Sequence, residues 1–285
     1  MILIPSFLAY LSLADGYSDP YYLRFKKREF QSLILGTSRA AQGIQPSEIN
    51  RILGREDVYN YSFSISHSPY GELYKHSILS RLSDNSQDQI FILSLDPWSI
   101  SENTNRPRRE FDGPLNQPTL SQPWLGLNYL LFHFQGHLGN ILLMKFIKPM
   151  FLHEDGWLEV MIPMDSASIE KRTLSKIQTY REENLPNYFI SPKRMSSLEG
   201  LIISLQEKGS VFLVILPVES RIHEIDLQLD PDFSDRAQEI SIKLNAPLLD
   251  FSNQGKRFVY TDGNHLSPAS GKKVSKIIAD WIQDN

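Results

Sequence analysis

Short apolar runs separated by polar turns recur along this chain. Residues 32–36, 58–63, 89–95 and 211–216 are runs of this kind, and 247–251 is a shorter one. A strand that is buried on both faces reads as a continuous apolar run, whereas a strand with one wet face alternates apolar and polar positions. These runs therefore predict the buried strands of a mainly parallel sheet.

Helical patterns lie between and after these runs. One helix is predicted by four leucine and isoleucine positions at i, i+3, i+4 and i+7 spacing: Leu198, Leu201, Ile202 and Leu205. Further helices are predicted over 233–244 and from Pro268 to the end of the chain. Ser68-Pro69 predicts another helix start, with serine as the cap and proline at the first helical position. Strands alternating with helices indicate an α/β fold.

The regular alternation lapses between residues 101 and 196, where prolines interrupt the pattern. We interpret 101–196 as an insertion after the third strand that forms a lid or small subdomain. It is expected to hold one or two apolar helices near 125–148 and a strand near 157–162. Residues 30–100 and 197–285 then form the α/β core, and 1–29 form an N-terminal lead-in.

The first fourteen residues are apolar but too few to span a bilayer, which takes about 20 residues. They lack the basic start of a signal peptide, and Pro5 interrupts them. One interpretation is a strand or short helix that packs on the core. The other is the end of a membrane anchor or signal. Both stay open from the sequence.

Composition and charge narrow the function classes. Hydrophobic residues make up 41% of the 285 and charged residues 22%, which is typical of a globular protein and not of a disordered chain. With 29 basic and 33 acidic residues, the net charge of −4 gives no electrostatic reason to bind nucleic acid. Cysteine is absent, so disulfides, thiolate catalysis and cysteine-based metal sites are excluded.

Candidate chemistry gathers where the strands end. Ligands of open parallel sheets bind beyond the carboxyl ends of the strands, and the first strand delivers Ser38 there. The loop before the last helix delivers Asp262 and His265. A histidine can take the proton of a serine hydroxyl, and a carboxylate on the far ring nitrogen orients the imidazole. These residues therefore predict a nucleophile, a base and an orienting acid.

The motifs that carry these residues resemble those of the SGNH/GDSL hydrolase superfamily. The marks are Leu35-Gly36-Thr37-Ser38-Arg39, Asp262-Gly263-Asn264-His265 and the second block at 58–64. The chain looks closest to the branch near bacterial envelope O-acetyltransferases. The resemblance covers roughly 30–100 and 197–285, and it implies a flavodoxin-like three-layer sandwich. It also implies Ser38 as nucleophile, His265 as base and Asp262 as acid.

The chain departs from the family pattern at the oxyanion hole. The glycine of the second block is not evident, because Ser62 or Ser64 stands near its place. Ser94-Leu95-Asp96-Pro97 replaces the usual Gly-x-Asn-Asp of the third block. Asn60 and an asparagine from the insertion such as Asn103 are candidate donors. Because one lost donor can cost ~10²–10³ in rate, an impaired member of the family is a second hypothesis.

Each candidate also has a purely structural interpretation. Ser38 could cap the following helix, and His265 could be an ordinary loop residue. Arg39 is either an ion-pairing residue or a substrate anchor, and Asp96 either ends a strand or lines the site. Trp98 either packs in the core or stacks on a sugar ring.

Two further side-chain clusters have weaker functional interpretations. His133 and His137 lack the third ligand of a catalytic zinc site. The arginines at 106, 108 and 109 form either a solvated loop or a contact for an anionic glycan. Neither cluster changes the leading interpretation of the site.

The leading hypothesis is a serine-dependent ester hydrolase or O-acyltransferase that forms an acyl-enzyme on Ser38. The rival is a catalytically impaired SGNH-fold component of an envelope polysaccharide system. A small-molecule or glycan ester is the expected partner, with neither metal nor organic cofactor and without nucleic acid. The carbohydrate substrate, the bacterial envelope location and membrane proximity are implied by the resemblance, and a cytoplasmic location stays open.

Overall fold

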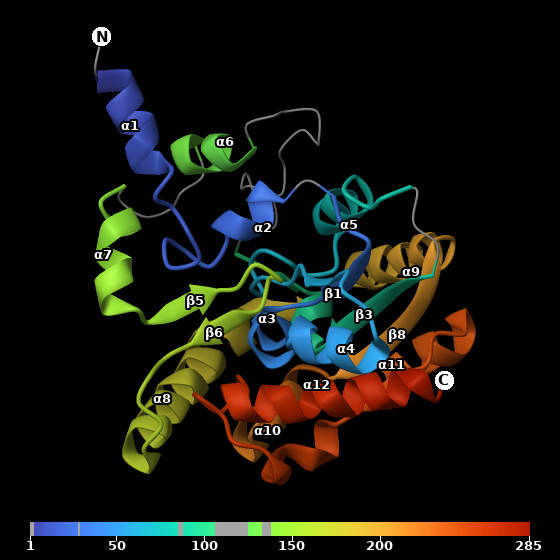
Figure 1. Ribbon diagram of the computed structural model, residues 1–285. Helices are drawn as coiled ribbons and strands as arrows, with labels where there is room; N and C mark the ends of the chain where they lie inside the picture. The colour runs from blue at the N-terminus through green and yellow to red at the C-terminus, as the bar shows by residue number, and fades with distance from the viewer. Residues whose placement is uncertain (1–2, 28, 85–87, 106–124, 133–137) are drawn as a thin grey trace.

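A five-stranded parallel sheet forms the centre of the protein in a computed structural model that describes residues 3–27, 29–84, 88–105, 125–132 and 138–285 (Figure 1). Its strands are β1 Ser32–Leu35, β2 Val58–Asn60, β3 Gln89–Leu95, β8 Gly209–Ile215 and β9 Leu248–Asp250. They lie in the order β2-β1-β3-β8-β9, and every neighbouring pair is parallel. This is the 2-1-3-4-5 order of flavodoxin-like folds. The predicted fold class and the five predicted strands are confirmed.

Helices cover both faces of the sheet and complete three layers (Figure 1). On β3, Phe91 and Leu93 belong to one apolar cluster, and Ile92 between them belongs to another. Successive strand residues point to opposite faces, so each face needs its own cover. One face packs against α5 Glu72–Leu79, α9 Pro192–Gln206 and α11 Phe233–Leu244. The other packs against α3 Ser38–Gly43, α4 Pro46–Leu53 and α12 Pro268–Gln283.

Smaller elements precede β1 and fill most of the connection between β3 and β8. Before β1 lie α1 Leu3–Leu11 and α2 Tyr22–Lys26. After β3 follow η1 Pro97–Ile100, β4 Ser101–Asn103, α6 Leu125–Phe132, α7 Asn140–Ile147, β5 Met150–Leu152, β6 Leu158–Val160, α8 Ser166–Thr179, η3 Tyr180–Asn184, η4 Leu185–Asn187 and β7 Tyr188–Ile190. β4 pairs with β7 and β5 with β6, both antiparallel. Helices α6 and α7 and strand β6 match the elements expected near 125–148 and 157–162.

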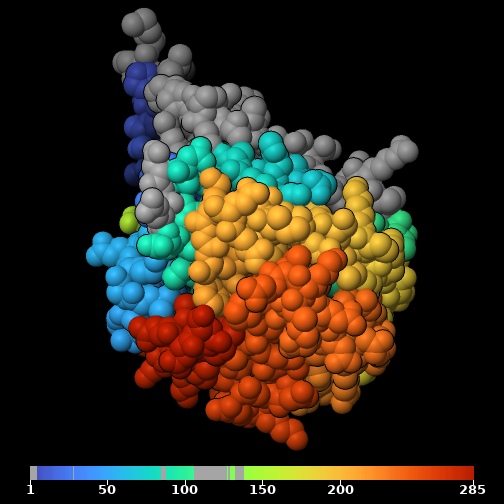
Figure 2. Space-filling view, turned by 90° about the vertical axis from the view of Figure 1, so that its right-hand side faces the viewer, coloured from blue at the N-terminus to red at the C-terminus, as the bar shows by residue number. Residues whose placement is uncertain are grey.

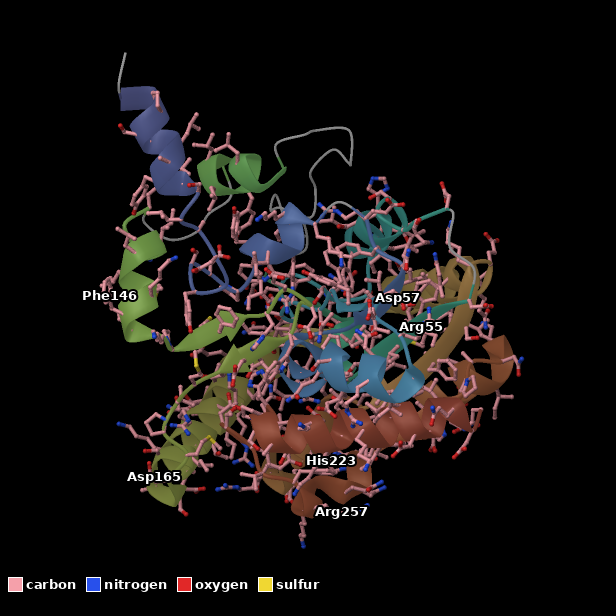
Figure 3. The ribbon with its side chains drawn as sticks, viewed as in Figure 1. Arg55, Asp57, Phe146, Asp165, His223 and Arg257 are labelled. Atoms are coloured by element: carbon pink, nitrogen blue, oxygen red, sulfur yellow. The ribbon has the colours of Figure 1, made fainter. Side chains whose placement is uncertain are left out.

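Helix α8 returns from the insertion to the carboxyl edge of the sheet. Asp165, labelled in Figure 3, lies at its start. The Asp165 carboxylate caps the first turn by accepting from the Ser168 N–H. A small apolar cluster joins α8 and η3 to η1 and to α10 Ser220–Leu229. Its buried members are Trp98, Ile177, Tyr180, Val218, Ile222 and Ile225. The insertion therefore contributes packing directly above the strand ends where the candidate residues were expected.

The helix start predicted at Ser68-Pro69 is wrong. Helix α5 begins at Glu72. The Ser68 hydroxyl donates to the Gly36 carbonyl at 2.6 Å instead of capping a helix, and it accepts from the Phe63 N–H at 3.1 Å. The serine is therefore used to hold the turn after β1.

The N-terminal segment forms a helix rather than a strand. In α1, residues 5–9 are exposed, and the following Leu11 and Ala14 are buried in the core. Helix α1 stands at one end of the molecule (Figures 1 and 2). Nearby α7 is also apolar on its outer side, where Phe146 is 84% exposed (Figure 3). None of the helices in the described ranges combines the length and the apolar character that crossing a bilayer needs.

Candidate active site

A tight turn after β1 brings Ser38 to the carboxyl edge of the sheet. Gly36 has φ +147°, and a Cβ there would come 2.9 Å from the Cβ of Ser94, so a larger residue is excluded. Thr37 then caps α3 by accepting from the Arg39 N–H. Ser38 is the first residue of this helix and is partly buried.

Ser38, His265 and Asp262 form one continuous hydrogen-bonded chain. The Oγ of Ser38 lies 2.9 Å from Nε2 of His265. On the other side of the ring, Nδ1 lies 3.0 and 2.9 Å from the two carboxylate oxygens of Asp262. A carboxylate only accepts hydrogen bonds, so Nδ1 carries the proton and Nε2 has a free lone pair toward Ser38. This is the geometry that a serine nucleophile and a histidine base require.

The Asp262 carboxylate also organises its own loop. Its Oδ1 accepts from the backbone N–H groups of Asn264, at 3.1 Å, and His265, at 2.9 Å. Burial raises the pKa of the Asp262 carboxyl, but the charge and hydrogen bonds of His265 outweigh this effect. Lys176, with Nζ 3.7 Å away, acts in the same direction, and together they hold the pKa well below its usual range. Asp262 is therefore an anion throughout the pH range in which an imidazole titrates.

Helix α8 of the insertion packs directly on this loop. The Nε of Arg172 donates to the Thr261 carbonyl at 2.8 Å. Thr173 faces Gly263, which has φ +76° and would place a Cβ 2.8 Å from the threonine methyl group. Together with Lys176, these contacts fix the Asp–His loop from the side of the insertion. The lid function of 101–196 stays a prediction, but its helix α8 supports the candidate site.

Arg39 lies under the site and is bound by protein groups. Its guanidinium donates to both carboxylate oxygens of Asp226, at 2.7 and 2.9 Å, and its Nε donates to Oδ1 of Asn264 at 3.0 Å. Burial lowers the pKa of Arg39, but the neighbouring carboxylates of Asp226 and Asp96 raise it overall. The side chain is 5% exposed. Its ion-pairing interpretation fits these contacts, and no contact suggests a substrate anchor.

Trp98 is fully buried in the same layer. Its Nε1 donates to Asp226 at 2.7 Å, and its ring stacks on Tyr180 with centroids 4.7 Å apart. The indole ring and the groups that it contacts all lie inside the protein. Trp98 therefore packs in the core and does not offer a surface on which a sugar ring could stack.

The candidate oxyanion donors of the second and third blocks are engaged elsewhere. Asn60 is fully buried, and both of its amide hydrogens are donated to carbonyls, those of Ala40 and Ile44 at 2.9 Å each. Ser62 is also fully buried and donates to the Ile34 carbonyl at 3.3 Å. These side chains have no hydrogen left for a substrate oxygen. Their proposed role gains no support from the geometry.

Asp96 and Asn103 are likewise held by local contacts. Asp96 is 2% exposed, and its carboxylate accepts from the Thr37 hydroxyl at 2.7 Å and from the Ser99 N–H at 2.8 Å. Burial raises the pKa of this carboxyl. Asn103, on β4, accepts from the Asn105 N–H at 2.9 Å. Asp96 therefore braces the turn that presents Ser38, and Asn103 belongs to a surface turn.

The described residues hold no group of three or more histidine, aspartate or glutamate side chains suited to a metal ion. The two histidines His133 and His137 and the arginines at 106, 108 and 109 lie outside the described residues. His153 pairs with Glu159 at 2.9 Å and stacks on Trp157, which accounts for its position on the β5–β6 hairpin.

Sequence reasoning missed four residues that surround the three predicted ones. Asn264, Lys176, Tyr180 and Asp226 contact either the Asp–His loop or Arg39. Only Asn264 had a local signal, because it lies between Asp262 and His265. The other three come from α8, η3 and α10, and no pattern in the chain links those elements to the strand ends.

No protein-family model matches this sequence, and no curated protein matches it. Among solved structures, the chain is similar to Est24, a carbohydrate acetylesterase from Sinorhizobium meliloti, with a TM-score of 0.43 and 10% sequence identity. The alignment covers 89% of this chain and 99% of Est24. Similarity of this degree carries neither an activity nor a substrate over to this chain.

Proposed function

We propose that this protein is a serine-dependent ester hydrolase or O-acyltransferase that works through an acyl-enzyme on Ser38. The observation that carries the proposal is the unbroken chain from Ser38 Oγ through His265 to Asp262, with both links near 2.9 Å. The intermediate burial of Ser38 supports it, because a nucleophile must be reachable by its substrate. The position beyond the carboxyl ends of β1 and β3 is where ligands of such sheets bind.

In the first half of the reaction, Ser38 Oγ attacks the acyl carbonyl carbon while its proton passes to His265 Nε2. The carbonyl electron pair moves to the oxygen and forms a tetrahedral intermediate. That pair returns as the bond to the alcohol oxygen breaks, and the proton on Nε2 goes to the departing alcohol. Asp262 stabilises the imidazolium and keeps its orientation throughout. The products are the free alcohol and an acyl ester of Ser38.

In the second half, an acceptor hydroxyl attacks the acyl-enzyme. His265 takes the proton of the acceptor and then returns it to Ser38 Oγ when the acyl–serine bond breaks. Water as acceptor gives a hydrolase, and a sugar hydroxyl gives an O-acyltransferase. The two activities use the same residues and differ in which acceptor reaches the acyl group.

The acyl donor that we propose is an acylated carbohydrate. Its support is the motif resemblance at Ser38, Asp262 and His265 to the SGNH/GDSL hydrolases near the envelope O-acetyltransferases. A fold hosts many substrates, so this part of the proposal depends on direct assay.

The rival proposal is a binding or assembly component of a polysaccharide system that keeps the fold without turnover. The observation that favours it is the missing pair of oxyanion donors: the hydrogens of Asn60 are both used internally, and Asp96 stands where the family has asparagine. An enzyme that lacks the side-chain donors expected from these two blocks should be slow, because one donor contributes ~10²–10³ in rate.

The test compares the full-length protein with Ser38→Ala and His265→Ala on p-nitrophenyl acetate and on acetylated glycans. Ser47→Ala, which changes an exposed serine on α4, is the matched control. The proposal predicts turnover that falls about 10⁴-fold or more in both site variants and is unchanged in the control. Mass spectrometry measures whether the product is free acetate or an acetylated acceptor. Free acetate indicates a hydrolase, and an acetylated acceptor indicates a transferase. Glycan binding with no turnover above the Ser38→Ala rate would support the rival.

A further inference from the structure

The side-chain amide of Asn264 contacts the proposed base at the nitrogen that faces Ser38. Its Nδ2 lies 3.2 Å from Nε2 of His265, the same atom that lies 2.9 Å from Ser38 Oγ. Asn264 is 2% exposed, so it makes these contacts within the protein. A donor group is therefore present next to the proposed nucleophile and base, where the expected side chains of the second and third blocks supply none.

Two donors fix which end of the amide faces His265. The Oδ1 atom accepts from Nε of Arg39 at 3.0 Å and from the hydroxyl of Tyr180 at 3.2 Å. Because both partners donate, the oxygen must face them and the NH₂ group must face the imidazole. Arg39 is itself held by Asp226. The amide is thus preorganised, which is what makes a hydrogen-bond donor effective in a transition state.

We propose that Asn264 Nδ2 is a side-chain donor of the oxyanion hole, and this proposal rests on the proposed esterase or acyltransferase function. Before reaction, an Nδ2–H of Asn264 and the Ser38 hydroxyl share the single lone pair of His265 Nε2. When Nε2 takes the serine proton, that lone pair is gone and the two N–H groups oppose each other. The same step creates negative charge on the acyl oxygen. The Asn264 N–H then donates to the negatively charged acyl oxygen, because the protonated Nε2 of His265 can no longer accept.

The test measures steady-state kinetics of Asn264→Ala and Asn264→Asp on p-nitrophenyl acetate. Asn253→Ala, at an exposed asparagine in η5 (Ser252–Arg257), is the matched control. Each variant is assayed over a full pH–rate profile and compared at its plateau, so that a changed proton affinity of the base does not contribute. The proposal predicts that kcat falls ~10²–10³-fold in Asn264→Ala, with KM within about threefold of wild type because a transition-state contact is lost.

The aspartate variant separates an oxyanion donor from a structural residue. Aspartate keeps the shape of asparagine and an oxygen for Arg39 and Tyr180, but it has no N–H to donate. An oxyanion donor predicts that Asn264→Asp loses at least as much kcat as Asn264→Ala, although its thermal midpoint stays closer to wild type. Asn264→Asp with a kcat near wild type rules out an oxyanion donor, because this variant has no side-chain N–H. Because aspartate preserves the Arg39 contact, the proposal stays testable even where the alanine variant folds poorly.

The possible failures are distinguishable. If wild type and Asn253→Ala turn over but Asn264→Asp stays within about threefold of their kcat, Asn264 is not an oxyanion donor and the proposed function stands. If wild type shows no turnover above Ser38→Ala, the proposed function is overturned and the role of Asn264 with it.

Discussion

The buried ion pair of Arg39 and Asp226 lies beneath the candidate site, and its contribution to stability can be predicted quantitatively. Their side chains are only 5% and 7% exposed, and two hydrogen bonds of 2.7 and 2.9 Å join them. Trp98 donates a third hydrogen bond to the same carboxylate. Asp226→Asn keeps the shape of the side chain but removes its negative charge. It also places an amide N–H against an N–H of the Arg39 guanidinium, where neither group can accept a hydrogen bond. Arg39 is then a buried cation without its principal counter-charge.

Removing one partner of a buried, hydrogen-bonded ion pair costs about 3–5 kcal/mol in the free energy of unfolding. For a domain of this size, we expect the thermal midpoint to fall by roughly 10 °C. Chemical denaturation at pH 7 measures the free energy, and calorimetry measures the midpoint. The turnover number of the folded fraction should fall as well, because Arg39, which holds the oxygen of Asn264, loses the carboxylate that fixes its own position.

The chain contains a matched control for this variant. Arg221 makes the same two-pronged contact with Glu170, at 2.8 Å for each bond, but these side chains are 38% and 50% exposed. Glu170→Gln should change stability little, because water screens and replaces the interaction. The reasoning is refuted if Asp226→Asn costs less than about 1 kcal/mol, which is the range of an exposed pair.

Two further predictions concern pH and backbone strain. Burial, reinforced by the positive charge of Arg24, lowers the pKa of His67 to about 4. Since this value lies below the ordinary 6.5, its contribution to stability is complete above pH 6.5 and is lost as the pH falls toward 4. We expect this contribution to reach about 3 kcal/mol. Urea unfolding at pH 7 and at about pH 4.5 should therefore show a smaller loss of stability at the lower pH in His67→Gln than in wild type. An equal loss in both proteins contradicts this. Gly263→Ala should lower kcat at least about tenfold, because a φ of +76° disfavours alanine and its methyl group meets Thr173. Adding Thr173→Ser removes the steric part and should restore part of the loss, whereas a single variant with wild-type kcat refutes the strain argument.

The buried strands and the last helix could be predicted because their signals are local. Strand β8 is buried over its last five residues, so its sequence is an unbroken apolar run. Pro268 predicted the start of α12, and Ser267 caps this helix by accepting from the Ser270 N–H. Ser68-Pro69 also predicted a helix start, but that helix begins three residues later, at Glu72. The difference is tertiary, because the Ser68 hydroxyl is used on the Gly36 carbonyl.

Helix α8 could not be predicted, because its apolar side is too narrow to produce a helical pattern. Only Thr173 and Ile177 are buried among its fourteen residues. It is held instead by polar contacts from Arg172 and Lys176 to the loop at 261–262. These contacts depend on where the insertion folds back, which a local pattern does not record.

The candidate site also has a part that could be predicted from the sequence and a part that could not. Asp262 and His265 share one loop, and strand order alone brings Ser38 to them across 227 residues. The direction of the Asn264 amide depends on Arg39 and on Tyr180, which lie 225 and 84 residues away in sequence. Residue type and position in the fold were therefore readable from the sequence. The hydrogen bonds that select one amide orientation were not.

Labelling of Ser38 by a fluorophosphonate tests the central claim most directly. The probe forms a stable phosphonyl ester only with a serine that a neighbouring base activates. Intact-mass measurement should show one adduct on wild type and on the control Ser47→Ala, and none on Ser38→Ala. Wild type without an adduct, or equal labelling of Ser38→Ala, would contradict the assignment of Ser38 as an activated nucleophile.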